Sequence, residues 1–474
     1  QMQGKKYGEG GNIFDKKVGV AIVFFVKDLN AKKECQIHYY DIGDYLSREA
    51  KLQKIEDFKT LENVPFVRIM PNQKGDWINQ RGENFDKLIP LKSEKKQQGI
   101  FIINATGVVS GRDSWAYNFS TKTLKDSMQR CIDAYNEDLA RFNKDKFIKK
   151  CKDKNLKKSD YYKELSDKDI STDTTKIAWS RDLKKSFIEN QCLADFDENK
   201  VRIAFYRPFA KAYLYFDDFW IEEQSKIKSL FPKKESENIL ITTTKGIFGA
   251  CICDGIPDLH FIGDTWAFPL YYYEDGQREC AISDFAVSEC EKILGVSVEK
   301  EEIFYYIYAL FHHKGFVEKY KFELCKEAPR VSISKDFKAL SNLGRKLADL
   351  HLNYENGELY KEVEFQALAD INDDEMYKVK QIIKSKDGAT LHYNANINLK
   401  NIPPKAYSYK INGRSAIDIF IDRYQIKQDK ASLISNNPND FRGSKYIYEL
   451  LCRLIVLALK SVDMIEDISR REFE

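Results

Sequence analysis

The segment Val201–Phe209, VRIAFYRPF, begins a series of short aromatic strands that decides the fold of the larger part of the chain. AYLYF, NILITTT, ACICD, LHFIG and FPLYYY follow it between residues 212 and 273, and turn residues separate them. Short runs rich in β-branched and aromatic residues, bounded by turn signals, are typical of strands. The sequence therefore predicts an antiparallel or mixed β region here.

Apolar segments nearer the N-terminus predict part of an α/β sheet. Val18–Val26 (VGVAIVFFV) has apolar side chains on both faces, as in a central strand of a covered sheet. Cys35–Tyr40 (CQIHYY) predicts a second strand, paired with the first as a hairpin at the sheet edge, and Gly99–Asn104 (GIFIIN) predicts another buried strand. Ser47 has the position and chemistry of a helix N-cap before residues 48–58.

A long helix is predicted between these two regions, from about Thr123 to Lys150, from its apolar spacing. Residues 144–168 hold ten lysines, which allow two interpretations. They can form an arm that contacts phosphates, or an exposed spacer helix, since five acidic residues dilute the charge. The spacer is the favoured interpretation.

The sequence of the last third of the chain predicts three helices and a hairpin. Helices are expected at Glu302–Phe311, at Asp336–Leu350 and from about Ser444 to Leu459. A strand at residues 376–383, an Asp-Gly turn and a strand at residues 390–399 form the predicted hairpin. The fold class is therefore α/β near the N-terminus and mixed α+β beyond the helical spacer.

The composition limits the function only loosely. The 474 residues carry 76 Lys and Arg against 73 Asp and Glu, a net charge of +3. This balance excludes a histone-like basic tail but not a nucleic-acid binder whose positive charge lies on one face. The longest apolar run has nine residues, too few to span a bilayer. We expect no secretory signal, and ten scattered cysteines indicate a reducing cytosol.

Several catalytic motifs are absent from the sequence. It has no GxxxxGK[ST] phosphate loop, no GxGxxG turn after a strand, and no HExxH or CxxC metal motif. Asp-x-Lys tripeptides of the kind found in metal-dependent nucleases begin at Asp57, Asp182 and Asp336. A chain with 31% charged residues produces such tripeptides by chance.

Several segments together resemble the type ISP restriction-modification enzymes. Residues 8–27 (GEGGNIFDKKVGVAIVFFVK) resemble the late strands of the methyltransferase domain in these single polypeptides. Five later blocks, in the same order, resemble the family's C-terminal specificity region: Gly111–Phe119, Arg202–Phe209, Pro257–Tyr271, Gly344–Glu355 and Ile411–Asp440. Together the blocks reach across almost the whole chain.

The resemblance implies three regions. Residues 1–125 would be the C-terminal part of a methyltransferase-like α/β domain, the truncated edge of a Rossmann-like sheet. Residues 126–195 would be a helical, Lys-rich spacer, and residues 196–474 a mixed α+β target recognition domain. In the family, a nuclease, an ATP-driven translocase and a coupler precede the adenine methyltransferase and recognition domains.

The resemblance also implies where chemistry is not expected. The glycine-rich cofactor motif and the NPPY motif are missing, and Asn437–Asp440 (NPND) lacks the second proline and the aromatic residue. We expect no catalytic residue, metal or cofactor in this chain; S-adenosylmethionine, ATP and Mg are implied only for the parent enzyme. The implied partners are double-stranded DNA and the rest of the parent polypeptide, in the cytoplasm and without a membrane.

Recognition of a duplex requires two kinds of contact. Lys and Arg bind phosphates, while Arg, Lys, Asn and Gln read base edges. The candidates lie in loops beside the aromatic strands and in the C-terminal turns: Lys245, Gln277, Arg278, Arg414, Lys427, Lys430 and Arg442. A solvated surface charge is the alternative for each. Gln277 is suited to adenine.

Three further residues have predicted structural roles. Arg112 and Trp115 are expected to close a seam between the methyltransferase and recognition regions. Arg207, before a proline, is expected to support the turn after its strand.

Two other functions stay open at this stage. The chain can be an active methyltransferase or nuclease in its own right, which transfer of labelled methyl or metal-dependent cleavage would support. It can also be a protein-interaction scaffold whose aromatic β region docks a subunit, which capture of a protein partner without DNA affinity would favour.

Overall fold

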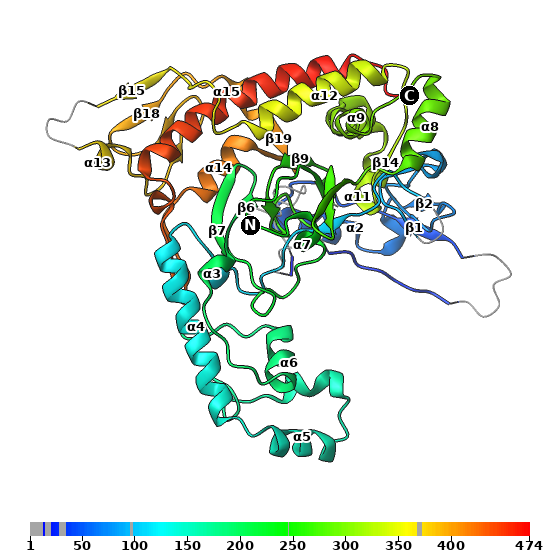
Figure 1. Cartoon of the computed structure of the whole chain (residues 1–474). Helices are drawn as coiled ribbons and strands as arrows, with labels where there is room; N and C mark the ends of the chain where they lie inside the picture. Colours follow the sequence, from blue (N-terminus) through cyan, green and yellow to red (C-terminus); the bar gives the residue numbers. More distant parts are fainter. Residues whose placement is uncertain (1–12, 15–19, 28–34, 95–97, 245, 367–371) are drawn as a thin grey trace. The chain divides into compact units, whose positions relative to one another are not determined.

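The structure is a computed structural model that describes residues 13–14, 20–27, 35–94, 98–244, 246–366 and 372–474 (Figure 1). The chain divides into two compact units, residues 1–85 and 86–474. The domain boundaries predicted after residues 125 and 195 stay predictions.

The first unit holds a two-stranded sheet and a helix. β1 (Ile37–Tyr39) pairs antiparallel with β2 (Val67–Ile69), and α2 (Arg48–Phe58) lies between them in sequence. The side chain of Ser47 accepts a hydrogen bond from the backbone N–H of Ala50 at 3.1 Å, which confirms the predicted N-cap.

The strand predicted at Val18–Val26 is wrong over its described part. Residues 20–27 have no regular secondary structure, and Phe25 and Val26 are 90% and 92% exposed. The hairpin with Cys35–Tyr40 is also wrong, because β1 pairs with β2. A strand that is apolar on both faces needs neighbours that cover it, and the described residues of this unit supply only the two-stranded sheet; residues 18 and 19 lie outside them.

Two four-stranded sheets form the β region of the second unit, in the orders β10-β6-β7-β5 and β4-β11-β8-β9. β6 and β10 are parallel and the other pairs are antiparallel, which confirms the mixed β region. The strands are β4 (Ala105–Thr106), β5 (Tyr117–Asn118), β6 (Val201–Arg207), β7 (Ala210–Tyr215), β8 (Leu240–Thr244), β9 (Ala250–Cys253), β10 (Ile256–Pro257) and β11 (Thr265–Pro269).

Two segments that were predicted as strands do not form strands in the structure. Gly99–Asn104 contributes only isolated bridges from Phe101 to Lys92 and to Ile282, and Ile102 is 51% exposed. Residues 259–263 form the connection between β10 and β11. Short apolar runs do not distinguish a strand from a packed loop by periodicity.

The spacer consists of α4 (Thr121–Arg141), α5 (Lys144–Asp153), the 3-10 helix η3 (Lys158–Glu164) and α6 (Arg181–Glu189). The single long helix predicted here is wrong, because it breaks before α5. Asn143 caps α5 by accepting a hydrogen bond from the backbone N–H of Lys146 at 3.0 Å. The predicted apolar face of α4 is buried in the core of the spacer.

Three helices, α9 (Lys300–His312), α12 (Phe337–Leu352) and α15 (Ser444–Ser469), pack together in the last third of the chain (Figure 1). They confirm the three helices predicted there. A small sheet in the order β15-β18-β17-β16 accompanies them. Its strands are β15 (Val363–Phe365), β16 (Ile383–Lys384), β17 (Leu391–His392) and β18 (Ile397–Leu399).

The hairpin predicted in this region is correct only around its turn. Gly388, at a φ of +75°, lies in the turn that joins β16 to β17. Most of the predicted first strand is not a strand, because α13 (Asp373–Tyr377) occupies its start. Asn372 caps α13, and such local capping overrides the strand pattern.

Candidate functional site

Helix α14 (Ala416–Arg423) positions a group of basic side chains in the second unit. Ser415 caps its start by accepting a hydrogen bond from the backbone N–H of Asp418 at 3.0 Å. At its other end, the hydroxyl of Tyr424 donates to the backbone oxygen of Phe209 at 3.1 Å. The last turn of α14 is therefore held beside the turn between β6 and β7.

This contact brings together four basic side chains, named here the α14 basic cluster: Arg207, Arg414, Arg423 and Lys427. Burial lowers the pKa of Arg423, and repulsion from Arg207 and Arg414 lowers it further, while Tyr206 and Asp422 oppose this shift. Burial also lowers the pKa of Lys427, with Arg423 contributing. The like charges are thus close enough to repel one another.

The carboxylates at the cluster neutralise it only in part. Arg414 forms an ion pair with Asp422 and donates to the backbone oxygen of Asp418 at 3.1 Å. Lys427 donates from Nζ to the backbone oxygen of Asp422 at 2.8 Å. Arg423 has no ion pair within the described residues, and its buried Nε has no hydrogen-bond partner there. An arginine without a carboxylate, among other cations, is a favourable position for an anion such as a phosphate.

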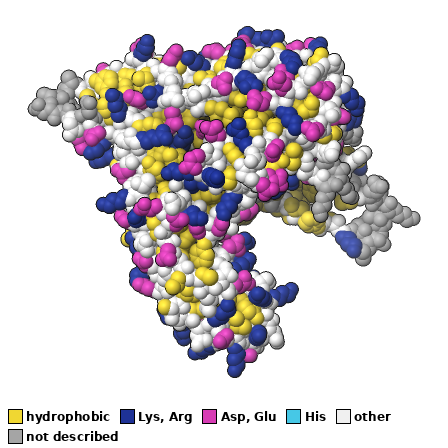
Figure 2. All heavy atoms as spheres, in the orientation of Figure 1, with side chains coloured by type: hydrophobic (Ala, Val, Ile, Leu, Met, Phe, Trp, Pro, Cys, Tyr) yellow, Lys and Arg dark blue, Asp and Glu magenta, His cyan; other side chains and the backbone are white. Residues whose placement is uncertain are grey.

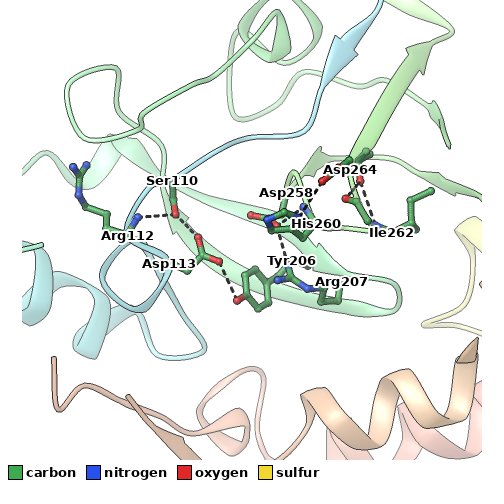
Figure 3. A network of polar contacts seen from close by, with 11 residues as sticks. Ser110, Arg112, Asp113, Tyr206, Arg207, Asp258, His260, Ile262 and Asp264 are labelled. Carbon is green, nitrogen blue, oxygen red and sulfur yellow. Dashed lines mark hydrogen bonds and ion pairs between the residues drawn. The ribbon is translucent and has the colours of Figure 1, made fainter. Parts of the chain in front are cut away.

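A partly buried polar network includes Arg207 of the cluster (Figure 3). Arg207 pairs with the buried carboxylate of Asp258 at 2.8 Å and stacks on the ring of Tyr206, with its guanidinium carbon 4.0 Å from the ring centroid. The Tyr206 hydroxyl donates to Asp113 at 3.2 Å. Burial raises the pKa of Asp258, and the Arg207 charge opposes this rise. These contacts give Arg207 a structural role in which it ties β6 to the segment that follows β10, rather than to the turn after its own strand.

A short hairpin follows the cluster directly. β21 (Lys427–Gln428) pairs antiparallel with β22 (Ser435–Asn436), and residues 429–434 join them. Lys430 lies in this connection with an exposed side chain. The structure therefore brings Arg414 and Lys427 together and places Lys430 in the loop that follows them.

The predicted residues near the aromatic strands lie elsewhere. Lys245 lies outside the described residues. Gln277 and Arg278 begin β13 (Gln277–Cys280), which pairs with β12 (Tyr271–Glu274), so they follow the turn rather than form it. Arg278 lies over the ring of Tyr271 at 4.5 Å and 3.9 Å from a carboxylate oxygen of Glu237. Among the described residues, the bonds and ion pairs of Arg278 stay within this part of the β region and do not reach the α14 basic cluster.

Arg442 is also engaged within the protein. Its guanidinium pairs with Glu355 at 3.0 Å, and Glu355 also pairs with Lys211 at 2.6 Å. Arg442 has a φ of +57° and lies over the rings of Phe441 and Tyr446. These contacts hold Arg442 at the junction before α15. Its guanidinium is therefore less available to bind an external ligand than the side chain of Lys430.

Arg112 ties together three segments that are far apart in the sequence. Its guanidinium donates to the backbone oxygens of Ala178, at 3.1 Å, and Trp220, and to the hydroxyl of Ser180 at 2.8 Å. It therefore bonds to the end of the spacer and to the β region, and the predicted seam between a methyltransferase region and a recognition region stays a prediction. Trp115 is buried in the core of the spacer.

Arg423 is the site residue that the sequence alone did not single out. A basic residue in the last turn of a helix is usually explained by the helix dipole. The available signal was its spacing: Arg423 lies nine residues after Arg414 and four before Lys427, both of which were candidates.

Side chains of both charges are mixed on the face of the protein that Figure 2 draws, where Lys and Arg are interspersed with Asp and Glu. No three His, Cys, Asp or Glu side chains are grouped as metal ligands in the ranges that the structure describes. Across the same ranges, none of the helices has the length and apolarity needed to cross a membrane.

Comparison with known proteins identifies the family. Residues 99–450 match the family model of the type ISP C-terminal specificity domain. The chain belongs to this family. The type ISP match covers the β region, the spacer and most of the C-terminal helices. No curated protein matches.

Solved structures of type ISP enzymes are similar to this chain. One is a nuclease-deletion mutant of the type ISP restriction-modification enzyme LlaGI in complex with a DNA substrate mimic, with a TM-score of 0.78 and 34% identity over 91% of this chain and 33% of that one. Another is the ATP-dependent type ISP enzyme LlaBIII bound to DNA, with a TM-score of 0.84 and 33% identity over 98% of this chain and 29% of that one. This chain thus spans about a third of their length.

A third structure shares the fold. The DrdV–DNA complex has a TM-score of 0.76 and 23% identity over 91% of this chain and 43% of that one. These similarities confirm the predicted mixed architecture and the predicted family.

Proposed function

We propose that this chain is the double-stranded DNA recognition portion of a type ISP restriction-modification enzyme. The observation that carries the proposal is the α14 basic cluster, in which Arg423 has no carboxylate partner within the described chain and lies beside Arg207, Arg414 and Lys427. Cations that carboxylates neutralise only in part, held on a rigid support, bind DNA phosphates and fix the register in which other side chains read bases. The DNA complexes of LlaGI and LlaBIII support the same assignment.

In this proposal the chain selects the site, and other parts of a longer polypeptide act on it. Those parts carry adenine methylation with S-adenosylmethionine, and restriction with ATP and Mg. An adenine must leave the duplex stack before its amino group is methylated, so the recognition portion has to hold the duplex while a neighbouring domain takes the base. The proposed location is the cytoplasm.

A binding selection from a random duplex pool tests the proposal. The 474-residue chain should enrich one asymmetric sequence, and its affinity for that duplex should fall with salt. With Arg423, Lys427 and Lys430 on phosphates, the slope of log K against log salt should be about −3 or steeper. Fluorescence anisotropy with the enriched duplex measures this slope.

The controls separate sequence-specific binding from non-specific electrostatic binding of DNA. A scrambled duplex of the same composition should bind at least about a thousandfold more weakly. If the folded chain, checked by circular dichroism, enriches no sequence at any salt concentration, the proposal is wrong.

A further inference from the structure

An exposed leucine lies at the tip of the hairpin that follows the α14 basic cluster. Leu433, between β21 and β22, is 57% exposed and has a φ of +57°. Leucine in the left-handed region costs about 1–2 kcal/mol relative to an ordinary conformation. Residues in uncommon backbone conformations cluster at binding sites, and the exposed part of the Leu433 side chain is open to a contact outside the chain.

The loop holds this conformation by its own hydrogen bonds. One carboxylate oxygen of Asp429 accepts from the backbone N–H groups of Ala431 at 3.2 Å and Ser432 at 2.7 Å, and from the Ser432 hydroxyl at 2.8 Å. The backbone N–H of Leu433 donates to the oxygen of Asp429 at 2.9 Å, and its carbonyl accepts from the side chain of Gln428 at 3.0 Å. The loop's own hydrogen bonds therefore fix the conformation of the tip before any partner binds.

The base of the hairpin is anchored to other elements. Ile434 is 5% exposed and belongs to the core of the spacer. Thr174 donates from its hydroxyl to the backbone oxygen of Ala431 at 3.0 Å, and Asn118 in β5 donates to the oxygen of Ser435 at 3.1 Å. Ser432 and Ile434 are buried, whereas Lys430 and Leu433 are exposed.

The surroundings of Leu433 favour DNA as its partner. Lys427 and Lys430 in the same hairpin have exposed side chains, and Lys427 adjoins Arg423 of the α14 basic cluster. A protein or lipid partner for one leucine would need a wider apolar surface. A single rigid apolar side chain flanked by cations matches the wedges that proteins insert between base pairs.

We propose that Leu433 is a DNA-contacting residue that inserts between base pairs beside the phosphates held by the α14 basic cluster. This inference rests on the proposed function and adds a residue to it. Insertion of an apolar side chain unstacks one base step, and the energy of unstacking depends on the sequence of that step. Leu433 would therefore contribute to the choice of site.

The variant Leu433→Gly separates this role from a structural one. Glycine suits a φ of +57°, and more than half of the leucine surface is already exposed. The thermal midpoint should stay the same or rise. Affinity for the duplex enriched by the wild-type chain should fall about tenfold. The slope of log K against log salt should not change, because an apolar contact releases no counterion.

Three further variants complete the test. Lys430→Gln should lower the salt slope by about one, and Leu433→Met, which keeps an apolar side chain of similar reach, should retain most of the affinity. Leu359→Gly, at another exposed leucine (41%) outside the hairpin, should leave DNA binding unchanged.

A duplex carrying 2-aminopurine at each base step in turn reports the insertion directly. Its fluorescence should rise at one step with the wild-type chain and not with Leu433→Gly. If Leu433→Gly binds as tightly as the wild type, or if no step brightens, the inference is wrong while the proposed function stands. If the wild-type chain selects no duplex, the proposed function itself fails.

Discussion

Arg423 lies among like charges without a carboxylate partner in the described chain. Its replacement by glutamine, Arg423→Gln, should lower duplex affinity about tenfold and reduce the salt slope by about one, because a phosphate contact is lost. The thermal midpoint should stay the same or rise, since a repelled charge is removed. Anisotropy titrations at several salt concentrations and thermal melts measure the two effects.

Arg470 provides the matched control. It is exposed and pairs with Asp467 at 3.0 Å in the last turn of α15. Arg470→Gln should leave affinity and salt slope unchanged. Equal losses in the two variants would mean that the chain binds DNA through its overall charge and not through the α14 basic cluster.

The residue types near the site could be predicted from the sequence. Whether each basic side chain is free to bind DNA, or is already paired within the protein, could not. Arg414 and Lys427 were candidates because basic residues in polar loops suit phosphates, and the structure does bring them together around Asp422. Arg442 had the same signal, yet Glu355 engages it from 87 residues away. Distant pairing of this kind leaves no local trace in the sequence.

At the scale of elements, the close contact of α9 and α12 depends on one glycine. A Cβ atom placed on Gly344 would lie 2.0 Å from the backbone oxygen of Tyr305. Gly344→Ala would therefore force the helices apart and should lower the free energy of unfolding by about 2–4 kcal/mol. Urea denaturation followed by circular dichroism measures this loss.

Gly357 is the control for this substitution. A Cβ atom there meets nothing within 4 Å, so Gly357→Ala should change the stability by less than about 1 kcal/mol. If Gly344→Ala is as stable as Gly357→Ala, the packing of α9 on α12 is looser than the structure describes.

Elements with local signals were predicted well, and those that depend on neighbours were not. The boundaries of α2 follow from Ser47 and the residues after it, which act within one turn. The break before α5 depends on Asn143, whose cap competes with an otherwise continuous helical pattern. Residues 20–27 have the composition of a central strand, but strand formation requires partners that the described part of their unit does not provide.

At the scale of the whole molecule, stability should depend on pH through two histidines among the C-terminal helices. Burial lowers the pKa of His312 in α9 to about 4, and burial lowers the pKa of His351 in α12 well below its usual value. His351 joins α12 to both α9 and α15, because its ring nitrogens lie 2.6 Å from the Tyr308 hydroxyl and 2.8 Å from the Ser461 hydroxyl. Both imidazoles are therefore neutral in the folded chain.

The sign of the pH effect follows from these lowered pKa values. Below a pH of about 6.5 the unfolded chain binds protons at both histidines while the folded chain does not, so the free energy of unfolding falls with pH. Stability should be full above this pH and decrease by about 1–2 kcal/mol per histidine towards pH 5. Urea denaturation between pH 5 and 8 should show this decrease, and His312→Gln should flatten part of it.

His260, whose side chain is 56% exposed, is the control: His260→Gln should keep the full decrease. A wild-type chain equally stable at pH 5 and pH 8 would show that these histidines are not held neutral between the helices.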